Sequence, residues 1–123
     1  SQSDRPVLAQ MASVVLERLG EWRELTAEVI AMSQRDVQEI GASSVDFLQY
    51  SAYVLLAGFW LQAAARAQDA LDAESGEAAF YQAKLHSADF YLRRILPRAS
   101  AHRESLQGGA DCLMAMPESS FAF

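Results

Sequence analysis

Apolar residues recur at helical spacing through most of the sequence, and the pattern is clearest between Phe80 and Pro97. The apolar positions that define it are Tyr81, Leu85, Ala88, Leu92 and Ile95. Their intervals of four, three, four and three residues place them on one face of a helix, and further aromatic residues widen this face. We therefore expect a helix with neighbours on more than one side. This helix must stop or kink at Pro97, because the proline ring removes an intrahelical hydrogen bond and crowds the preceding turn.

The same spacing near the start of the chain predicts a long amphipathic helix over roughly residues 7–32. Its apolar face is formed by Leu8, Ala12, Val15, Leu19, Trp22, Thr26 and Val29. Ser33 followed by Asp36 resembles a capping box, in which a serine oxygen accepts a backbone N–H of the next helix. A second helix is therefore expected to begin there. Gly41 and the serines after it weaken its first turns, so we expect a kink or a brief break before Val45.

No charged residue occurs between Phe47 and Ala65. As a helix this segment would be about 28 Å long, close to the thickness of a bilayer core, so a membrane span is one interpretation. Polar side chains within the segment, the low transfer energy of its alanines and the lack of flanking basic residues other than Arg66 favour the alternative. We expect the central helix of a bundle, because such a helix is apolar on nearly all sides.

The remaining segments are polar connections and a short C-terminal helix. Residues 68–77 predict a linker that leads to the helix before Pro97. Beyond the proline, residues 99–107 are expected to form a short polar helix that Gly108-Gly109 ends. The apolar residues 110–116 are then expected to cover one end of the bundle.

Length and composition agree with one folded domain. The chain has 123 residues, of which 51% are apolar, and this is enough to bury a core without disulfides or metals. Nowhere does an alternating pattern hold long enough to predict a strand. The sequence therefore predicts an all-α fold, an up-and-down helical bundle of three long helices plus a shorter fourth after Pro97, as a single domain over residues 1–123.

Charge and cysteine content narrow the class of protein. The formal net charge is −6, so a nucleic-acid partner is not expected. Cys112 is the single cysteine and cannot form an internal disulfide, which favours a reducing, cytoplasmic compartment. The sequence begins with Ser1 instead of an initiator Met and has no leader-like segment, so we expect a trimmed chain or a piece of a longer polypeptide.

Residue types that carry chemistry are few and scattered. Neither His86 nor His102 belongs to the Glu-x-x-His pairs that di-iron bundles need, so a surface or capping role is favoured for each over a metal ligand. Cys112 has no histidine or second cysteine nearby, and a small buried hydrophobe is favoured over a reactive thiol. Gly108-Gly109 is too short for a phosphate-binding loop. We therefore expect neither a catalytic residue nor a metal site in this chain.

Basic residues gather near the C-terminal end of the predicted bundle. The members of this group are Arg93, Arg94, Arg98, His102 and Arg103. One interpretation is a solvated helix end, where cations also suit the helix dipole. The other is a contact surface, because arginine can hold carboxylates or phosphates through two parallel hydrogen bonds. We treat the group as a candidate interdomain contact that could bind an acidic surface of a neighbouring domain or a nucleotide phosphate.

The helix that contains Phe80 carries the pattern Ala79-Phe80-Tyr81-x-Ala83-Lys84-x-x-x-Ala88-x-Phe90-Tyr91, followed by Leu96-Pro97 and by Gly109-Ala110-x-x-Leu113-Met114-Ala115. This pattern resembles the C-terminal helical domain of the longer FAD-dependent acyl-CoA dehydrogenases, the group that includes methylthiopropionyl-CoA dehydrogenase-like enzymes. Gly58-x-Trp60-Leu61 is similar to the second helix of the same domain. The sequence departs from the family pattern at His86-Ser87 and at Asp89.

The resemblance implies how the functions of the whole enzyme are divided. The enzyme would hold FAD, bind a fatty-acyl thioester of coenzyme A, remove the α-proton with a carboxylate and pass hydride from the β-carbon to the flavin. These pockets belong to the preceding domains of such enzymes, so the resemblance carries no catalytic residue onto this chain and no FAD bound by it alone. The implied partners are the catalytic domains of the same enzyme, in a homo-oligomer. A free-standing bundle that binds another protein through Arg93–Arg103 or through surplus aromatic residues is the alternative.

Overall fold

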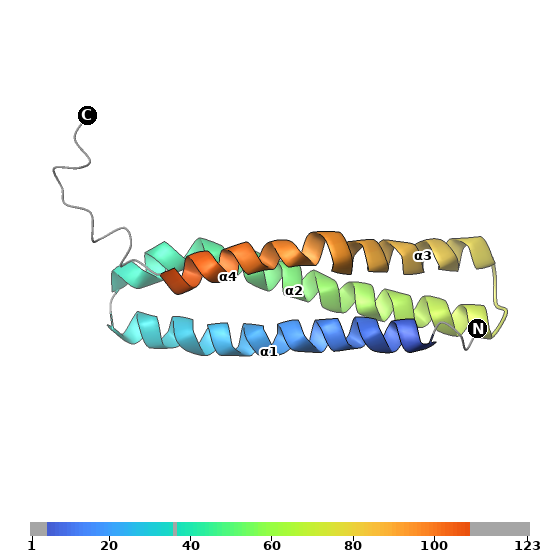
Figure 1. The fold of residues 1–123 in the computed structure, drawn as a ribbon, viewed down its shortest axis with the longest axis horizontal. Helices are drawn as coiled ribbons and strands as arrows, with labels where there is room; N and C mark the ends of the chain where they lie inside the picture. Colours follow the sequence, from blue (N-terminus) through green and yellow to red (C-terminus); the bar gives the residue numbers. More distant parts are fainter. Residues whose placement is uncertain (1–4, 36, 109–123) are drawn as a thin grey trace, which may run out of the picture.

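The computed structural model describes residues 5–35 and 37–108, and nearly all of them are helical. The helices are α1 (Arg5–Arg35), α2 (Val37–Asp72), α3 (Ala78–Phe90) and α4 (Ala99–Gly108), and a π-helical turn (Tyr91–Ile95) and a 3-10 turn (Leu96–Arg98) join α3 to α4. Figure 1 shows α4 continuing the line of α3, so that α1, α2 and the α3–α4 rod lie side by side. The predicted all-α, up-and-down bundle is confirmed, and the described ranges contain no strand.

The predicted fourth helix after Pro97 is present, but it does not form a separate rod. The regular α-helix ends at Phe90, and the N–H of Leu96 then bonds to the carbonyl of Tyr91, five residues earlier. After the proline, the N–H of Ala99 bonds to the carbonyl of Leu96, three residues earlier. Because Pro97 has no N–H, a wide turn before it and a tight turn after it replace the α-helical hydrogen bonds. The rod therefore continues although its hydrogen bonding changes.

The sequence predicts a kink or a brief break before Val45, and the break is wrong, whereas the kink stays a prediction. α2 runs as one helix through this region, from Val37–Asp72. The hydroxyl of Ser44 donates a hydrogen bond to the carbonyl of Gly41 at 3.2 Å, so this serine is satisfied inside the helix. Weak helix formers are tolerated here because the neighbouring helices stabilise α2 by packing.

The predicted linker over residues 68–77 is wrong in its first half, because α2 continues to Asp72. Arg5, at the start of α1, donates hydrogen bonds to Asp69 at 2.9 Å and to Asp72 at 2.6 Å. Gln68 is fully buried and donates to Asp72 at 2.9 Å. The polar residues that suggest a linker in the sequence are therefore the last turn of a helix that is tied to α1.

The turn after α2 is a Schellman motif, a helix ending that requires one residue in the left-handed conformation. Its two hydrogen bonds run from the N–H of Ser75 to Ala70 O (2.9 Å) and from the N–H of Glu74 to Leu71 O (3.1 Å). Glu74 occupies the left-handed position with a φ of 53°, where glycine is usual. Gly76 also has a positive φ, of 79°, and an added Cβ would lie 3.2 Å from the hydroxyl of Tyr81.

α2 is the central helix, as predicted, because it packs against α1, α3 and α4. One core cluster consists of Met11, Val15, Ala57, Ala64, Ala88, Tyr91, Leu92 and Leu96. The other consists of Leu25, Met32, Tyr50, Val54, Ala99 and Leu106. α2 contributes the small residues Ala57 and Ala64 to the first cluster, and Tyr50 and Val54 to the second. In the part of the chain that the structure describes, no helix is long and apolar enough to cross a membrane.

Several predicted features lie outside the described residues. Asp36 of the predicted capping box is one of them. The prediction that Ser33 caps the second helix is wrong, because Ser33 lies within α1 and its hydroxyl donates a hydrogen bond to Ile30 O at 2.7 Å. The predicted cover of one bundle end over residues 110–116, including Cys112, also lies outside the described residues and stays a prediction.

Candidate functional site

The structure separates the five basic residues of the candidate interdomain contact into two groups. His102 and Arg103 of α4 are partly buried and pair with residues of neighbouring helices. Arg93, Arg94 and Arg98 are exposed around the joint between α3 and α4. The prediction of an interdomain contact therefore rests on the second group.

Glu21 of α1 is the centre of a partly buried polar network. Its Oε1 accepts hydrogen bonds from the hydroxyl of Tyr50 at 2.8 Å and from Arg18 Nη1 at 3.0 Å. Arg103 Nη1 lies 3.6 Å from the other carboxylate oxygen, and Arg18 Nη1 also donates to Ser100 Oγ at 3.1 Å. Burial, followed by the neighbouring Glu21, raises the pKa of Tyr50 to about 12. The network joins α1, α2 and α4, so Arg103 contributes to the bundle itself.

His102 connects α4 to α2. Its Nδ1 lies 3.0 Å from Asp46 Oδ1, and its ring stacks on Tyr53 with the ring centroids 5.9 Å apart. Both partners belong to α2, so the imidazole acts as a helix–helix contact. Across the described ranges, no three residues of the types His, Cys, Asp and Glu come together in a group that could hold a metal ion.

The exposed arginines differ in their partners. Arg93 Nε donates a hydrogen bond to Asp89 Oδ1 at 2.8 Å, and both side chains are exposed. Within the described residues, Arg94 and Arg98 make no hydrogen bond or ion pair. A guanidinium without a partner can bind a carboxylate or a phosphate bidentately. Arg94 and Arg98 are therefore the cations best placed to meet a partner surface.

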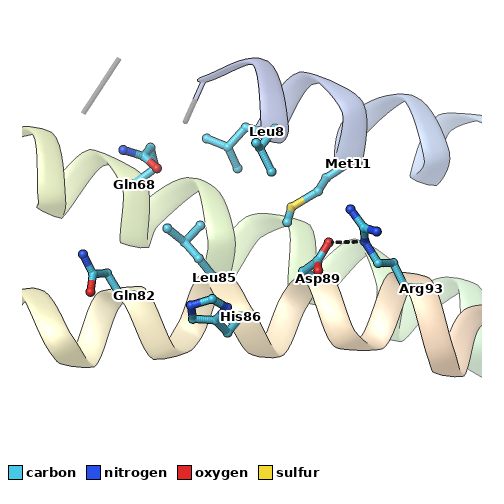
Figure 2. Close-up of a pocket in the computed structure, with 9 residues that line it drawn as sticks. Leu8, Met11, Gln68, Gln82, Leu85, His86, Asp89 and Arg93 are labelled. Atoms are coloured by element: carbon cyan, nitrogen blue, oxygen red, sulfur yellow. Dashed lines mark hydrogen bonds and ion pairs between the residues drawn. The ribbon is translucent and has the colours of Figure 1, made fainter. Parts of the chain in front are cut away.

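A groove of about 440 Å³ lies between α1, the end of α2 and α3 (Figure 2). Its lining residues are Val7, Leu8, Met11, Gln68, Gln82, Leu85, His86, Asp89 and Arg93. Leu8, Met11 and Leu85 make an apolar floor, and His86 and Asp89 follow one another along α3. These two α3 residues are positions at which the sequence departs from the family pattern.

The lining of the groove includes one carboxylate, one imidazole and one guanidinium. The carboxylate of Asp89 is already bound by Arg93, and none of the lining residues has a hydroxyl or thiol that could act as a nucleophile. The expectation that this chain carries no catalytic residue stays a prediction.

The most prominent surface feature is one that the sequence analysis did not identify. The outward side of α2 carries Val45, Leu48, Ala52, Leu55, Leu56 and Phe59, which we call the α2 outer face. Its large side chains are 64% (Val45), 66% (Leu48), 49% (Leu55), 48% (Leu56) and 63% (Phe59) exposed. Intervals of three and four residues between them are visible in the sequence, but a second apolar stripe on the same helix hides their meaning. A helix that is apolar on all sides can be fully buried or can keep one side for a partner.

A second exposed apolar region lies beside α3. Trp60, Phe90, Tyr91 and Ile95 border an open apolar hollow together with His86. The rings of Trp60 and Tyr91 stack with centroids 6.4 Å apart, and the Tyr91 hydroxyl donates to Tyr53 O at 2.7 Å. Burial raises the pKa of Tyr91 to about 12. Phe90, by contrast, is 59% exposed at the edge of this hollow.

Comparison with known proteins gives one family and a curated relative. The family model described as acetyl-CoA dehydrogenase C-terminal like matches residues 2–117. A 3-methylmercaptopropionyl-CoA dehydrogenase from Ruegeria pomeroyi is 31% identical over 107 residues, which are 84% of this chain. The same residues are 18% of that relative, so the chain spans less than a fifth of the length of the protein it matches. No solved structure matches the chain.

Proposed function

Because the chain belongs to the acetyl-CoA dehydrogenase C-terminal like family, we propose that it is the C-terminal helical domain of an FAD-dependent acyl-CoA dehydrogenase. The observation that carries this proposal is the family match over residues 2–117, nearly the whole sequence. The match to a relative whose name includes CoA dehydrogenase supports it. The whole enzyme would carry out the α,β-dehydrogenation of an acyl-CoA thioester in the cytoplasm.

The role of this domain in the proposed enzyme is packing and assembly. Its described residues do not fit FAD, because they offer no glycine-rich phosphate loop. In the groove of Figure 2, the guanidinium of Arg93 already donates a hydrogen bond to Asp89. We therefore assign the flavin, the thioester and the catalytic carboxylate to the domains that precede this one. The partners are those catalytic domains, within a homo-oligomer.

The natural gene product tests the proposal. We expect a purified protein much larger than 13.5 kDa, with the absorbance of bound flavin and with acyl-CoA-dependent reduction of an artificial electron acceptor. A natural product of about this mass without flavin would contradict the proposal. That result would favour the second candidate, a free-standing interaction module, for which the exposed α2 outer face is the supporting observation.

A further inference from the structure

The α2 outer face is a large exposed apolar patch. The largest apolar patch on a typical monomeric protein is roughly 300 to 600 Å² and is often functional. At their observed exposures, the five large side chains present roughly 500 Å² of apolar surface, if a fully exposed side chain of this size offers about 150 to 200 Å². No charge interrupts α2 between Phe47 and Ala65. The face is therefore fitted for a dry contact.

The apolar surface continues from α2 towards α3. Leu56 and Trp60 are one helical turn apart on α2, so they are neighbours on its surface. Trp60 in turn borders the hollow that Phe90 and Ile95 line from the other rod. Arg94 follows Phe90 by about one turn. The apolar surface thus reaches the segment of the other rod that carries the exposed residues Arg94 and Arg98.

We propose that the α2 outer face is the surface through which this domain packs against the preceding dehydrogenase domains of the same polypeptide. The contact on those domains would be an apolar face with carboxylates at the edge that meets Arg94 and Arg98. This inference rests on the proposed function and adds the identity of the surface and the chemistry of its partner.

Two observations favour a tethered partner over a second copy of the chain. The relative carries its matching region as 18% of a much longer polypeptide, so a covalently linked partner is available to that region. The exposed patch is also smaller than the roughly 800 Å² per partner that a stable complex of separate chains buries. A linked domain works at an effective concentration on the order of mM, so a smaller contact is sufficient to hold it.

Paired cysteine variants of the natural full-length protein test the surface. Leu48 on the α2 outer face and Leu16 on the outer side of α1 are matched, because they are 66% and 65% exposed in this domain. We would make Leu48→Cys and Leu16→Cys separately with Cys112→Ser, and follow maleimide labelling of each peptide by mass spectrometry. The proposal predicts that Leu48→Cys is labelled at least tenfold more slowly than Leu16→Cys in the folded enzyme. The two positions should be labelled at similar rates after denaturation.

The possible results distinguish failure of the proposed contact surface from failure of the proposed function. Similar labelling of both positions in a flavin-containing enzyme would overturn the inference and leave the proposed function in place. Protection of Leu48→Cys that disappears on hundredfold dilution would assign the face to a second copy and would also overturn the inference. A natural product without flavin and without further domains would remove the proposed function itself.

Discussion

α2 presents one side to the other helices and the opposite side to solvent, and both sides are mainly apolar. The buried side contains Val54, Ala57, Ala64 and Ala67, with Tyr50 and Gln68 as its large fully buried residues in the described part of α2. The exposed side contains the leucines and the phenylalanine of the α2 outer face. If burial within this bundle alone had determined α2, all of its large apolar side chains would face inward, where they remove the most area from water. Tyr53, Trp60 and Leu61 do pack against the core clusters, whereas the large side chains of the α2 outer face remain for another contact.

The strongest test of this contrast places the same charge on adjacent residues. We expect Val54→Asp to lower the free energy of unfolding by about 3 kcal/mol or more, because it leaves a carboxylate unpaired in the core. Leu55→Asp should change it by about 0.5 kcal/mol or less, because this side chain is half exposed. Chemical denaturation of this chain measures both values. Equal losses at the two positions would show that both sides of α2 are buried in this bundle.

High pH tests the tyrosines that the core holds neutral. Burial raises the pKa of Tyr50 and of Tyr91 to about 12 in the folded protein, from an ordinary value of 10.0. Between these values the unfolded chain loses a proton that the folded chain keeps, so the contribution of these tyrosines to stability falls as the pH rises from about 10 to 12 and is constant below that range. Each tyrosine should contribute a loss of about 2 to 3 kcal/mol over this window.

Denaturant midpoints measured from pH 8 to 12 would show this loss. Tyr91→Phe should reduce the slope and should also cost about 1 kcal/mol at neutral pH, since it removes the hydrogen bond to Tyr53 O. An unchanged alkaline slope in this variant would contradict the assigned pKa.

Replacing an alanine by leucine on each side of α2 should give a smaller difference in stability than the aspartate substitutions. Ala57→Leu should destabilise the protein by about 1 to 3 kcal/mol, because Ala57 is fully buried where helices meet. Ala52→Leu adds the same atoms to the α2 outer face and should change stability by about 0.5 kcal/mol or less. Thermal unfolding of the two variants side by side provides the comparison. Loss of stability in Ala52→Leu would show that the outer face packs against part of this chain.

The end of α2 provides the smallest expected effect, and one in the stabilising direction. Glu74→Gly should raise stability by about 0.5 to 1 kcal/mol, because glycine takes a positive φ without the cost that a side chain adds. Gly76→Ala should lower it by about 1 kcal/mol, since alanine is strained at a φ of 79° and its Cβ would approach Tyr81. If both changes were neutral in denaturation measurements, the Schellman motif would not form in solution.

The sequence predicts the helices from their local periodicity, and it predicts the central position of α2 from a segment that is apolar on nearly all sides. It fails between residues 68 and 72, where Asp69 and Asp72 suggest a linker but bind Arg5 from the start of the chain. It also fails before Val45, because Ser44 can use a carbonyl of its own helix. Whether a polar residue ends a helix or lies within it depends on the hydrogen-bond partners that the fold brings near it. The spacing of residues along the chain does not show these partners.

The candidate contact shows the same limit. Five basic residues are close together in the sequence, but Arg103 pairs with Glu21 and His102 with Asp46, and neither acidic partner is near them along the chain. The α2 outer face is visible in the sequence as intervals of three and four residues. The sequence does not show that this face is exposed, because the buried apolar side of α2 has the same intervals. Only the packing of the helices shows which of the two sides is buried.

The paired turns around Pro97 have a geometric consequence for the second half of the rod. A π-helical turn rotates the chain less per residue than an α-helix does, and a 3-10 turn rotates it more, so their angular errors have opposite signs and largely cancel. Ala88 and Leu92 before the proline and Ala99 and Leu106 after it are accordingly all buried. If one turn relaxed to α-helix without the other, α4 would roll about its own axis and swing Leu106 out of the core. The same face of the rod therefore points to the core before and after Pro97 only because the π-helical turn and the 3-10 turn occur together.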